Sequence, residues 1–139
     1  MSTWDLTEAK KDVANIFVSY PDVRLVTLFG SRARHDHKAS SDVDLIVWLQ
    51  PTSSKNRHDI WRFWDQASSH LQWSNRASIV TKKLGHVLYV HTLLLDLPEE
   101  HIPLYDPENC FNKIKKAIET WRQKNGSVKI PSFGGTHAG

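Results

Sequence analysis

The chain has 139 residues, of which 40% are hydrophobic and 24% charged, proportions that are typical of a globular protein and exclude a disordered or fibrous one. This length predicts one domain with a modest core and leaves no room for a second module that binds a large substrate. The net charge of +3, with eight histidines counted as neutral, favours anionic partners but does not choose between a nucleotide, a nucleic acid and an acidic protein surface.

The pattern of apolar and turn-forming residues predicts alternating helices and strands. In chain order these are a helix over 7–20, a strand over 23–29, a short helix over 32–35, a strand over 43–49, a helix over 58–71, a short strand over 77–81, a long strand over 87–97 and a final helix over 107–124. This order indicates an α/β fold with a mixed sheet of about four or five strands, helices mainly on one face and the functional cleft on the other. Residues 1–126 are expected to form the single domain. Residues 127–139 are rich in Gly, Ser, Pro and Thr and are expected to form a flexible tail.

The cysteine content and the hydropathy bear on the compartment. The single cysteine, Cys110, excludes an intrachain disulfide and disfavours a cysteine-based zinc site, which fits a reducing compartment. The N-terminal residues lack the basic-then-apolar layout of a signal peptide, and no apolar stretch is long enough to cross a bilayer. The sequence therefore predicts a cytoplasmic protein that does not enter a membrane.

The predicted helix over 58–71 carries two tryptophans with different expected roles. Trp64 shares an apolar stripe with Ile60 and Phe63, so it is expected in the core. Trp61 lies off this stripe. It is therefore expected on an exposed patch that meets a partner.

Two carboxylates, Asp42 and Asp44, lie at the start of the second predicted strand. Because alternate residues of a strand share a face, both side chains point the same way, about 6.6 Å apart along the strand. Two like charges on one face favour a cationic partner. Paired oxygen ligands at this spacing suit Mg²⁺ that is bound together with the phosphates of a substrate.

The turn after the first strand is suited to phosphate. The first backbone N–H groups of a helix lack partners, Gly30 lets the backbone approach a ligand closely, and the Ser31 hydroxyl adds a donor. Arg32 follows at once and is placed to contact phosphates. If the two strands are neighbours, this turn and the aspartate pair lie on the same edge of the sheet, which brings a triphosphate and a metal together.

These residues carry a resemblance to a known family. Gly30-Ser31-Arg32-Ala33-Arg34, followed by Ser41-Asp42-Val43-Asp44-Leu45, resembles the GS-x10-DxD signature of the polymerase-β-like nucleotidyltransferase superfamily, and the compact length resembles its minimal members. The resemblance covers about residues 23–48 well and the remainder only as an order of elements. It implies that Gly30, Ser31 and Arg32 bind ATP and that Asp42 and Asp44 bind Mg²⁺.

The resemblance leaves the third acidic position open. Members that catalyse transfer usually carry a third acid on a later strand, as general base and metal ligand. Within 87–97, alignment with the family's Val-Asp-Leu-Val stretch puts His91 at this position, whereas Asp96 is the only acid in the run. Strand parity favours His91, and a bulge would restore Asp96. A neutral imidazole can accept a proton, but it binds Mg²⁺ less well than a carboxylate does.

The function implied by the resemblance is Mg²⁺-dependent transfer of AMP from ATP to a hydroxyl, with release of pyrophosphate. Because the chain has no room for an acceptor domain, the acceptor is expected on another chain. Minimal members are often paired with a helical HEPN toxin, which they neutralise by binding it or by adenylylating its tyrosine, so the expected role is that of the antitoxin. The alternatives are an aminoglycoside-type small-molecule nucleotidyltransferase and a catalytically impaired member that binds nucleotide or protein. The small basic excess does not favour nucleic acid as a partner, and a homo-oligomer stays open.

Overall fold

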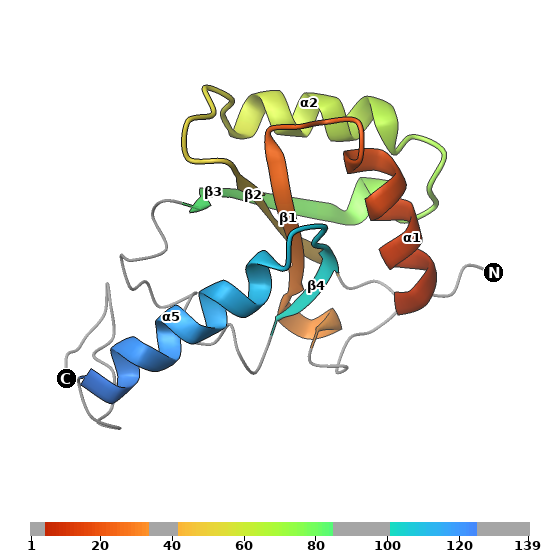
Figure 1. Cartoon of the computed structure of the whole chain (residues 1–139). Coiled ribbons are helices and arrows are strands. Elements are labelled where there is room, and N and C mark those ends of the chain that lie inside the picture. The colour runs from red at the N-terminus through yellow and green to blue at the C-terminus, as the bar shows by residue number, and fades with distance from the viewer. Residues whose placement is uncertain (1–4, 34–41, 85–100, 125–139) are drawn as a thin grey trace, which may run out of the picture.

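The structure, a computed structural model, describes residues 5–33, 42–84 and 101–124 of the chain (Figure 1). Its elements in chain order are α1 (Leu6–Phe17), β1 (Val23–Phe29), the 3-10 helix η1 (Gly30–Arg32), β2 (Val43–Leu49), α2 (Arg57–Ala67), the 3-10 helix η2 (Ser74–Arg76), β3 (Ala77–Lys83), β4 (Ile102–Tyr105) and α5 (Cys110–Lys124). The four described strands form one sheet in the order β3-β2-β1-β4. The β1–β2 and β1–β4 pairs are antiparallel and the β2–β3 pair is parallel, so the predicted mixed sheet is confirmed.

The two central strands, β1 and β2, have the predicted bounds because their sequences are nearly continuous apolar runs. The helices differ from prediction at their ends, where local side chains decide. The Asp5 side chain accepts from Thr7 N and starts α1 at Leu6. The Asp106 carboxylate accepts from the backbone N–H groups of Cys110 (2.6 Å) and Phe111 (3.0 Å), which starts α5 three residues later than predicted.

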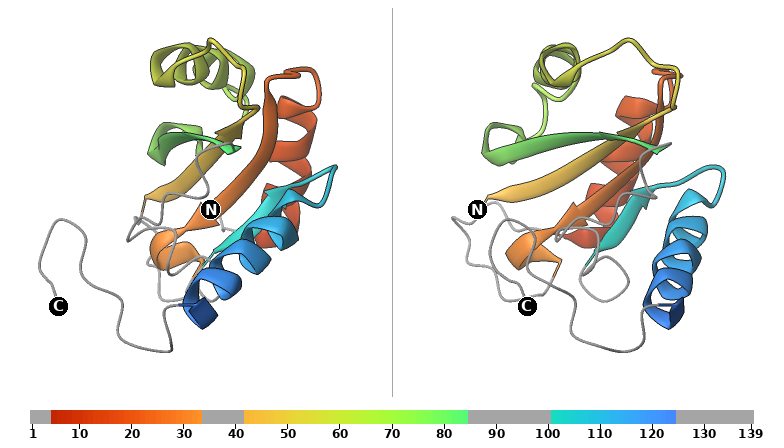
Figure 2. Two further views of the ribbon diagram at one scale, coloured as in Figure 1. Left: turned by 60° about the vertical axis from the view of Figure 1, so that its left-hand side comes forward. Right: turned by 90° about the vertical axis from the view of Figure 1, so that its left-hand side faces the viewer.

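Helices cover both faces of the sheet. Helices α1 and α2 pack on one face in the larger apolar cluster, whose central members include Phe17, Val26, Leu45 and Trp64. Helix α5 packs on the opposite face in a second, smaller cluster. This second cluster contains Leu25, Ile46, Trp48, Cys110, Phe111, Ile114 and Ile118. Figure 2 shows α5 well apart from α2, so the expectation of helices mainly on one face holds for α1 and α2, and α5 adds cover to the other face.

The third strand of the sheet follows directly from α2. The run β2–α2–β3 is a crossover that brings β3 parallel to β2, with Asp44 paired with Ser78 and Leu49 with Lys83. The short strand predicted over 77–81 is confirmed and continues to Lys83. The long strand predicted over 87–97 and the tail over 127–139 lie outside the described residues.

The fourth strand, β4, was not predicted. It has four residues, one of them Pro103, and it pairs with β1 on the side away from β2. Such a short strand gives too little alternation for a sequence pattern to register. In the described part of the chain, no helix is long and apolar enough to cross a bilayer.

Candidate active site

The candidate site lies where β1 ends and β2 begins. In the antiparallel register Phe29 pairs with Asp44, so the next residue, Gly30, lies beside the Asp44 side chain. Gly30 has φ of 76°, a conformation that side-chain-bearing residues rarely adopt. A Cβ added there would collide with Asp44 Oδ2 and would lie 3.3 Å from Asp44 Cγ. The backbone conformation thus favours glycine at position 30, and any larger residue there would also displace the Asp44 carboxylate.

The two aspartates sit at this edge with different exposure. Asp42 directly precedes β2 and is exposed, while Asp44 is half-buried within the strand. Within residues 5–33, 42–84 and 101–124, no three His, Cys, Asp or Glu side chains cluster as a metal site would require. Two carboxylates can still hold Mg²⁺, which protein sites commonly bind through one or two carboxylates while substrate phosphates and water supply the other ligands.

The turn after β1 differs in form from the prediction. Residues Gly30–Arg32 form one turn of 3-10 helix, closed by Ala33 N donating to Gly30 O at 3.1 Å, so the predicted short helix starts at Gly30 and not at Arg32. The positive φ of Gly30 sets this tighter turn. The Ser31 side chain lies outside the described part of the structure, so its predicted contact with phosphate stays a prediction.

Arg32 is the most buried charged residue described, with 1% of its surface exposed. Its pKa is lowered, first by burial and then by the nearby charge of Arg76. Arg76 ends η2, directly before β3, so two guanidinium groups lie near the β2 end that carries the aspartates. A direct contact between Arg32 and phosphate stays a prediction.

The strand beside the aspartates carries no acid. Ser78 of β3 is the register partner of Asp44, and the strand sequence Ala-Ser-Ile-Val-Thr-Lys-Lys contains no carboxylate. The third group was predicted within 87–97, but both candidates there, His91 and Asp96, lie outside the described residues. Ser78 was missed although the order strand, helix, strand signals a parallel crossover, which would have pointed to 77–83 as the neighbour of β2.

A buried histidine, also missed, lies on the other side of β1. His101 directly precedes β4, has 7% of its surface exposed, and stacks on Phe29 with ring centroids 5.5 Å apart. Since Phe29 precedes Gly30 and pairs with Asp44, His101 lies beside the turn that forms the site. Burial lowers the pKa of His101 from 6.5 to about 4, so the imidazole is neutral near pH 7.

The structure thus brings the Gly30 turn against Asp44, the second aspartate of the GS-x10-DxD pattern in the sequence. The chain belongs to the polymerase beta nucleotidyltransferase family, whose model matches residues 11–94. This match contains the turn at Gly30 and both aspartates. No curated protein matches the sequence.

Solved structures with this fold include toxin–antitoxin proteins. A chain of a toxin–antitoxin with AMP-PNP aligns with a TM-score of 0.57 and 16% identity over 84% of this chain and 89% of that one. A chain of a tri-AMPylated Shewanella oneidensis HEPN toxin in complex with its MNT antitoxin aligns with a TM-score of 0.54 and 14% identity over 87% and 90%. A putative nucleotidyltransferase from Sulfolobus solfataricus aligns with a TM-score of 0.50 and 22% identity over 75% and 82%. At these identities the likeness establishes the nucleotidyltransferase fold.

A double-mutant cycle tests the contact between Gly30 and Asp44. Gly30→Ala is expected to lower the free energy of unfolding by about 2–4 kcal/mol, because backbone strain and the collision with Asp44 add. In an Asp44→Ala background only the strain remains, so the same change should cost about 1 kcal/mol. Urea denaturation of the four proteins measures both values. Equal costs in the two backgrounds would show that the carboxylate does not press on position 30.

The buried imidazole predicts a loss of stability in mild acid. Because the pKa of His101 is about 4 in the folded protein and about 6.5 when unfolded, the unfolded chain takes up the proton first as the pH falls. The contribution of neutral His101 to the free energy of unfolding is complete above about pH 6.5 and is lost as the pH falls toward about 4. About 2 kcal/mol of it is lost between pH 7 and pH 5. Unfolding of wild type and His101→Phe at these two pH values measures it. A variant that loses as much stability as wild type would contradict the assignment.

Proposed function

We propose that this chain is a Mg²⁺-dependent nucleotidyltransferase that transfers AMP from ATP to a tyrosine hydroxyl of a helical HEPN-type toxin and so acts as its antitoxin. The observation that carries the proposal is the packing of the Gly30 turn against Asp44, because it supports a phosphate and a metal ion held side by side. The reducing compartment suggested by the single, buried Cys110 fits a cytoplasmic reaction.

Each residue of the site has a defined part in this proposal. Gly30 and Ser31 hold the triphosphate, with Arg32 supplying positive charge beside them, and Asp42 and Asp44 hold Mg²⁺. When bound, Mg²⁺ neutralises charge on the phosphates and aligns the attacking and leaving oxygens. The hydroxyl oxygen bonds to the α-phosphorus, the bond to pyrophosphate breaks, and the hydroxyl proton goes to a base, for which the predicted candidates are His91 and Asp96.

The described elements and the names of two solved structures support an acceptor on a second protein. All described elements belong to one sheet and the helices packed on it, so no second domain for an acceptor is present among them. Solved proteins of the same fold carry the names of a toxin–antitoxin with AMP-PNP and of an AMPylated HEPN toxin with its antitoxin. We therefore propose a HEPN-type toxin as the partner that carries the acceptor hydroxyl.

A transfer assay tests the proposal. The full chain is incubated with Mg²⁺, ATP labelled at the α-phosphate and a helical HEPN-type protein, and label on that protein is measured. Asp42→Asn and Asp44→Asn keep the side-chain shape but remove the metal-binding charge, so each should lower the transfer rate by at least about 100-fold. Asp65→Asn, an exposed carboxylate on α2, is the matched control and should not change it. Undiminished labelling by Asp44→Asn would remove the aspartate pair from the mechanism.

One observation favours a second candidate function, a nucleotide-binding member with impaired catalysis. The residue paired with Asp44 on the neighbouring strand is Ser78, which can neither bind Mg²⁺ as strongly as a carboxylate nor act as a general base. Under this reading the chain neutralises its partner by binding alone.

Ser78→Asp separates the two candidates. If the impaired reading holds, wild type binds ATP without transfer, and the added carboxylate beside Asp44 should raise transfer at least about tenfold. Ser78→Asn has nearly the same shape without the charge and should stay inactive. Transfer by wild type that Ser78→Asp lowers, through repulsion with Asp44, would reject the impaired reading.

A further inference from the structure

A hollow of about 510 Å³ lies between the start of α2 and the end of β3. Lys55 and Arg57 line it from the α2 side, and Lys82 and Lys83 line it from β3. We call this surface the basic hollow. Figure 1 shows the start of α2 and the end of β3 on the same side of the molecule, away from the η1 turn at the far end of β1. The basic hollow is therefore distinct from the candidate active site.

The four cations of the basic hollow are not neutralised by the protein. The lining residues include no Asp or Glu, and in residues 5–33, 42–84 and 101–124 none of the four cations is part of an ion pair. The nearest carboxylate on α2, Asp59, is engaged in the capping box, where it accepts from Asn56 N at 3.0 Å. Four like charges around one concavity produce a local positive potential that attracts a polyanion.

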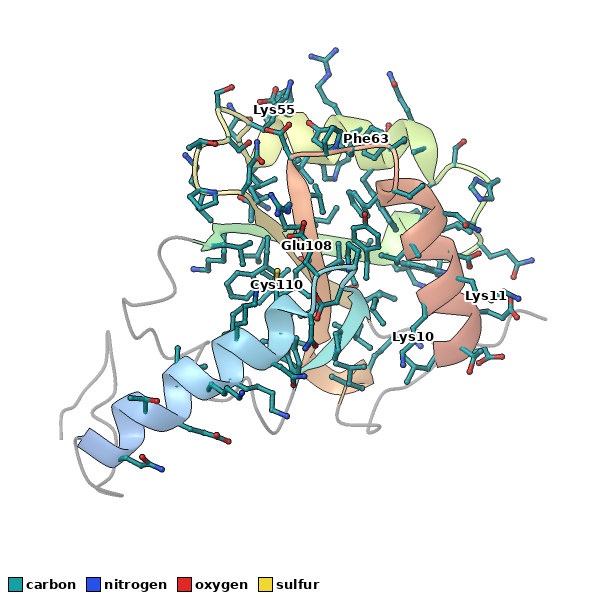
Figure 3. The ribbon with its side chains drawn as sticks, viewed as in Figure 1. Lys10, Lys11, Lys55, Phe63, Glu108 and Cys110 are labelled. Carbon is teal, nitrogen blue, oxygen red and sulfur yellow. The ribbon has the colours of Figure 1, made fainter. Side chains whose placement is uncertain are left out.

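An exposed indole lies one helical turn from this charge. Trp61 is 46% exposed and stands four residues after Arg57, so the two side chains share a flank of α2. The opposite flank carries Phe63, which contacts the rings of Phe17 and Tyr20 and faces α1 (Figure 3). Trp61 therefore lies on the flank that faces away from α1, toward the β3 side.

We propose that the basic hollow binds single-stranded nucleic acid, with phosphates held by Lys55, Arg57, Lys82 and Lys83 and a base stacked on Trp61. Cationic grooves beside exposed aromatic rings bind single strands in this way, because lysine and arginine pair with phosphates and every base has a face that can stack. An acidic protein segment would use the charges but would leave the indole without a stacking partner. Nucleic acid was not favoured from the sequence because the basic excess is small; the two basic pairs that line the hollow are far apart in the chain and meet only in the fold.

Binding of labelled oligonucleotides tests the proposal. Fluorescence anisotropy of the full chain with oligo-U and oligo-dT of about 12 nucleotides gives the affinity, and the two probes distinguish RNA from DNA. Contact with three or four phosphates predicts that log Ka falls with log salt concentration with a slope of about −2 to −3. The double variants Lys55→Gln/Arg57→Gln and Lys82→Gln/Lys83→Gln should each weaken binding about tenfold or more. Trp61→Ala should weaken it about 5- to 150-fold, and Trp61→Phe should restore part of the loss.

The matched control changes two lysines elsewhere. Lys10 and Lys11 lie on α1, on the far side of the molecule from Lys55 (Figure 3), and Lys10→Gln/Lys11→Gln makes the same change in net charge. This control, and Asp44→Asn, should bind the oligonucleotides like wild type.

Three results would overturn the proposal: a loss in the lysine control equal to that in the hollow variants, binding of neither oligonucleotide, or binding of a poly-glutamate peptide in their place. Asp44→Asn should lower AMP transfer without changing oligonucleotide binding, so failure of this proposal can be distinguished from failure of the proposed function. Thermal unfolding checks that every variant is folded.

Discussion

The antiparallel register of β1 and β2 is the constraint on which the rest of the structure depends. It pairs Phe29 with Asp44 and so sets Gly30 against the carboxylate. A slip of one residue would turn Asp44 into the larger apolar cluster and expose Leu45, which is fully buried. Moving this carboxylate into an apolar cluster would be costly, so the core favours the register that positions the site.

The crossover through α2 extends the same constraint to the third strand. With β2 fixed, the parallel pairing of β3 puts Ser78 beside Asp44, and Arg76 lies two residues before Ser78 in the chain. The same pairing carries Lys82 and Lys83 to the opposite end of the strand, beside the start of α2. One short strand thus supplies neighbours to the candidate active site at one end and a basic surface at the other.

The sequence predicted features that depend on one continuous segment of the chain. It did not predict neighbours that only strand pairing brings together. The bounds of β1 and β2, the shared edge of Gly30 and Asp44, and the buried Trp64 and exposed Trp61 were all predicted, because each follows from one apolar run or one motif. Ser78 and His101 were not predicted as part of the site, because only strand pairing places them near it. Neither β4 nor the later start of α5 at the Asp106 cap has a pattern long enough to detect.

The two faces of the sheet differ in how firmly they are held. Helices α1 and α2 share the larger cluster with three stacked or tilted aromatic pairs around Phe17 and Phe63, whereas α5 rests on the smaller cluster and on the Arg24–Glu108 ion pair at its start. Native proteins open first where the least apolar surface is buried. Because the two clusters lie on opposite faces of the sheet, opening of α5 would leave the packing of α1 and α2 in place. Such an opening would uncover Leu25, Ile46 and Trp48, on the sheet face that also carries Asp44, and would leave the β1–β2 register unchanged.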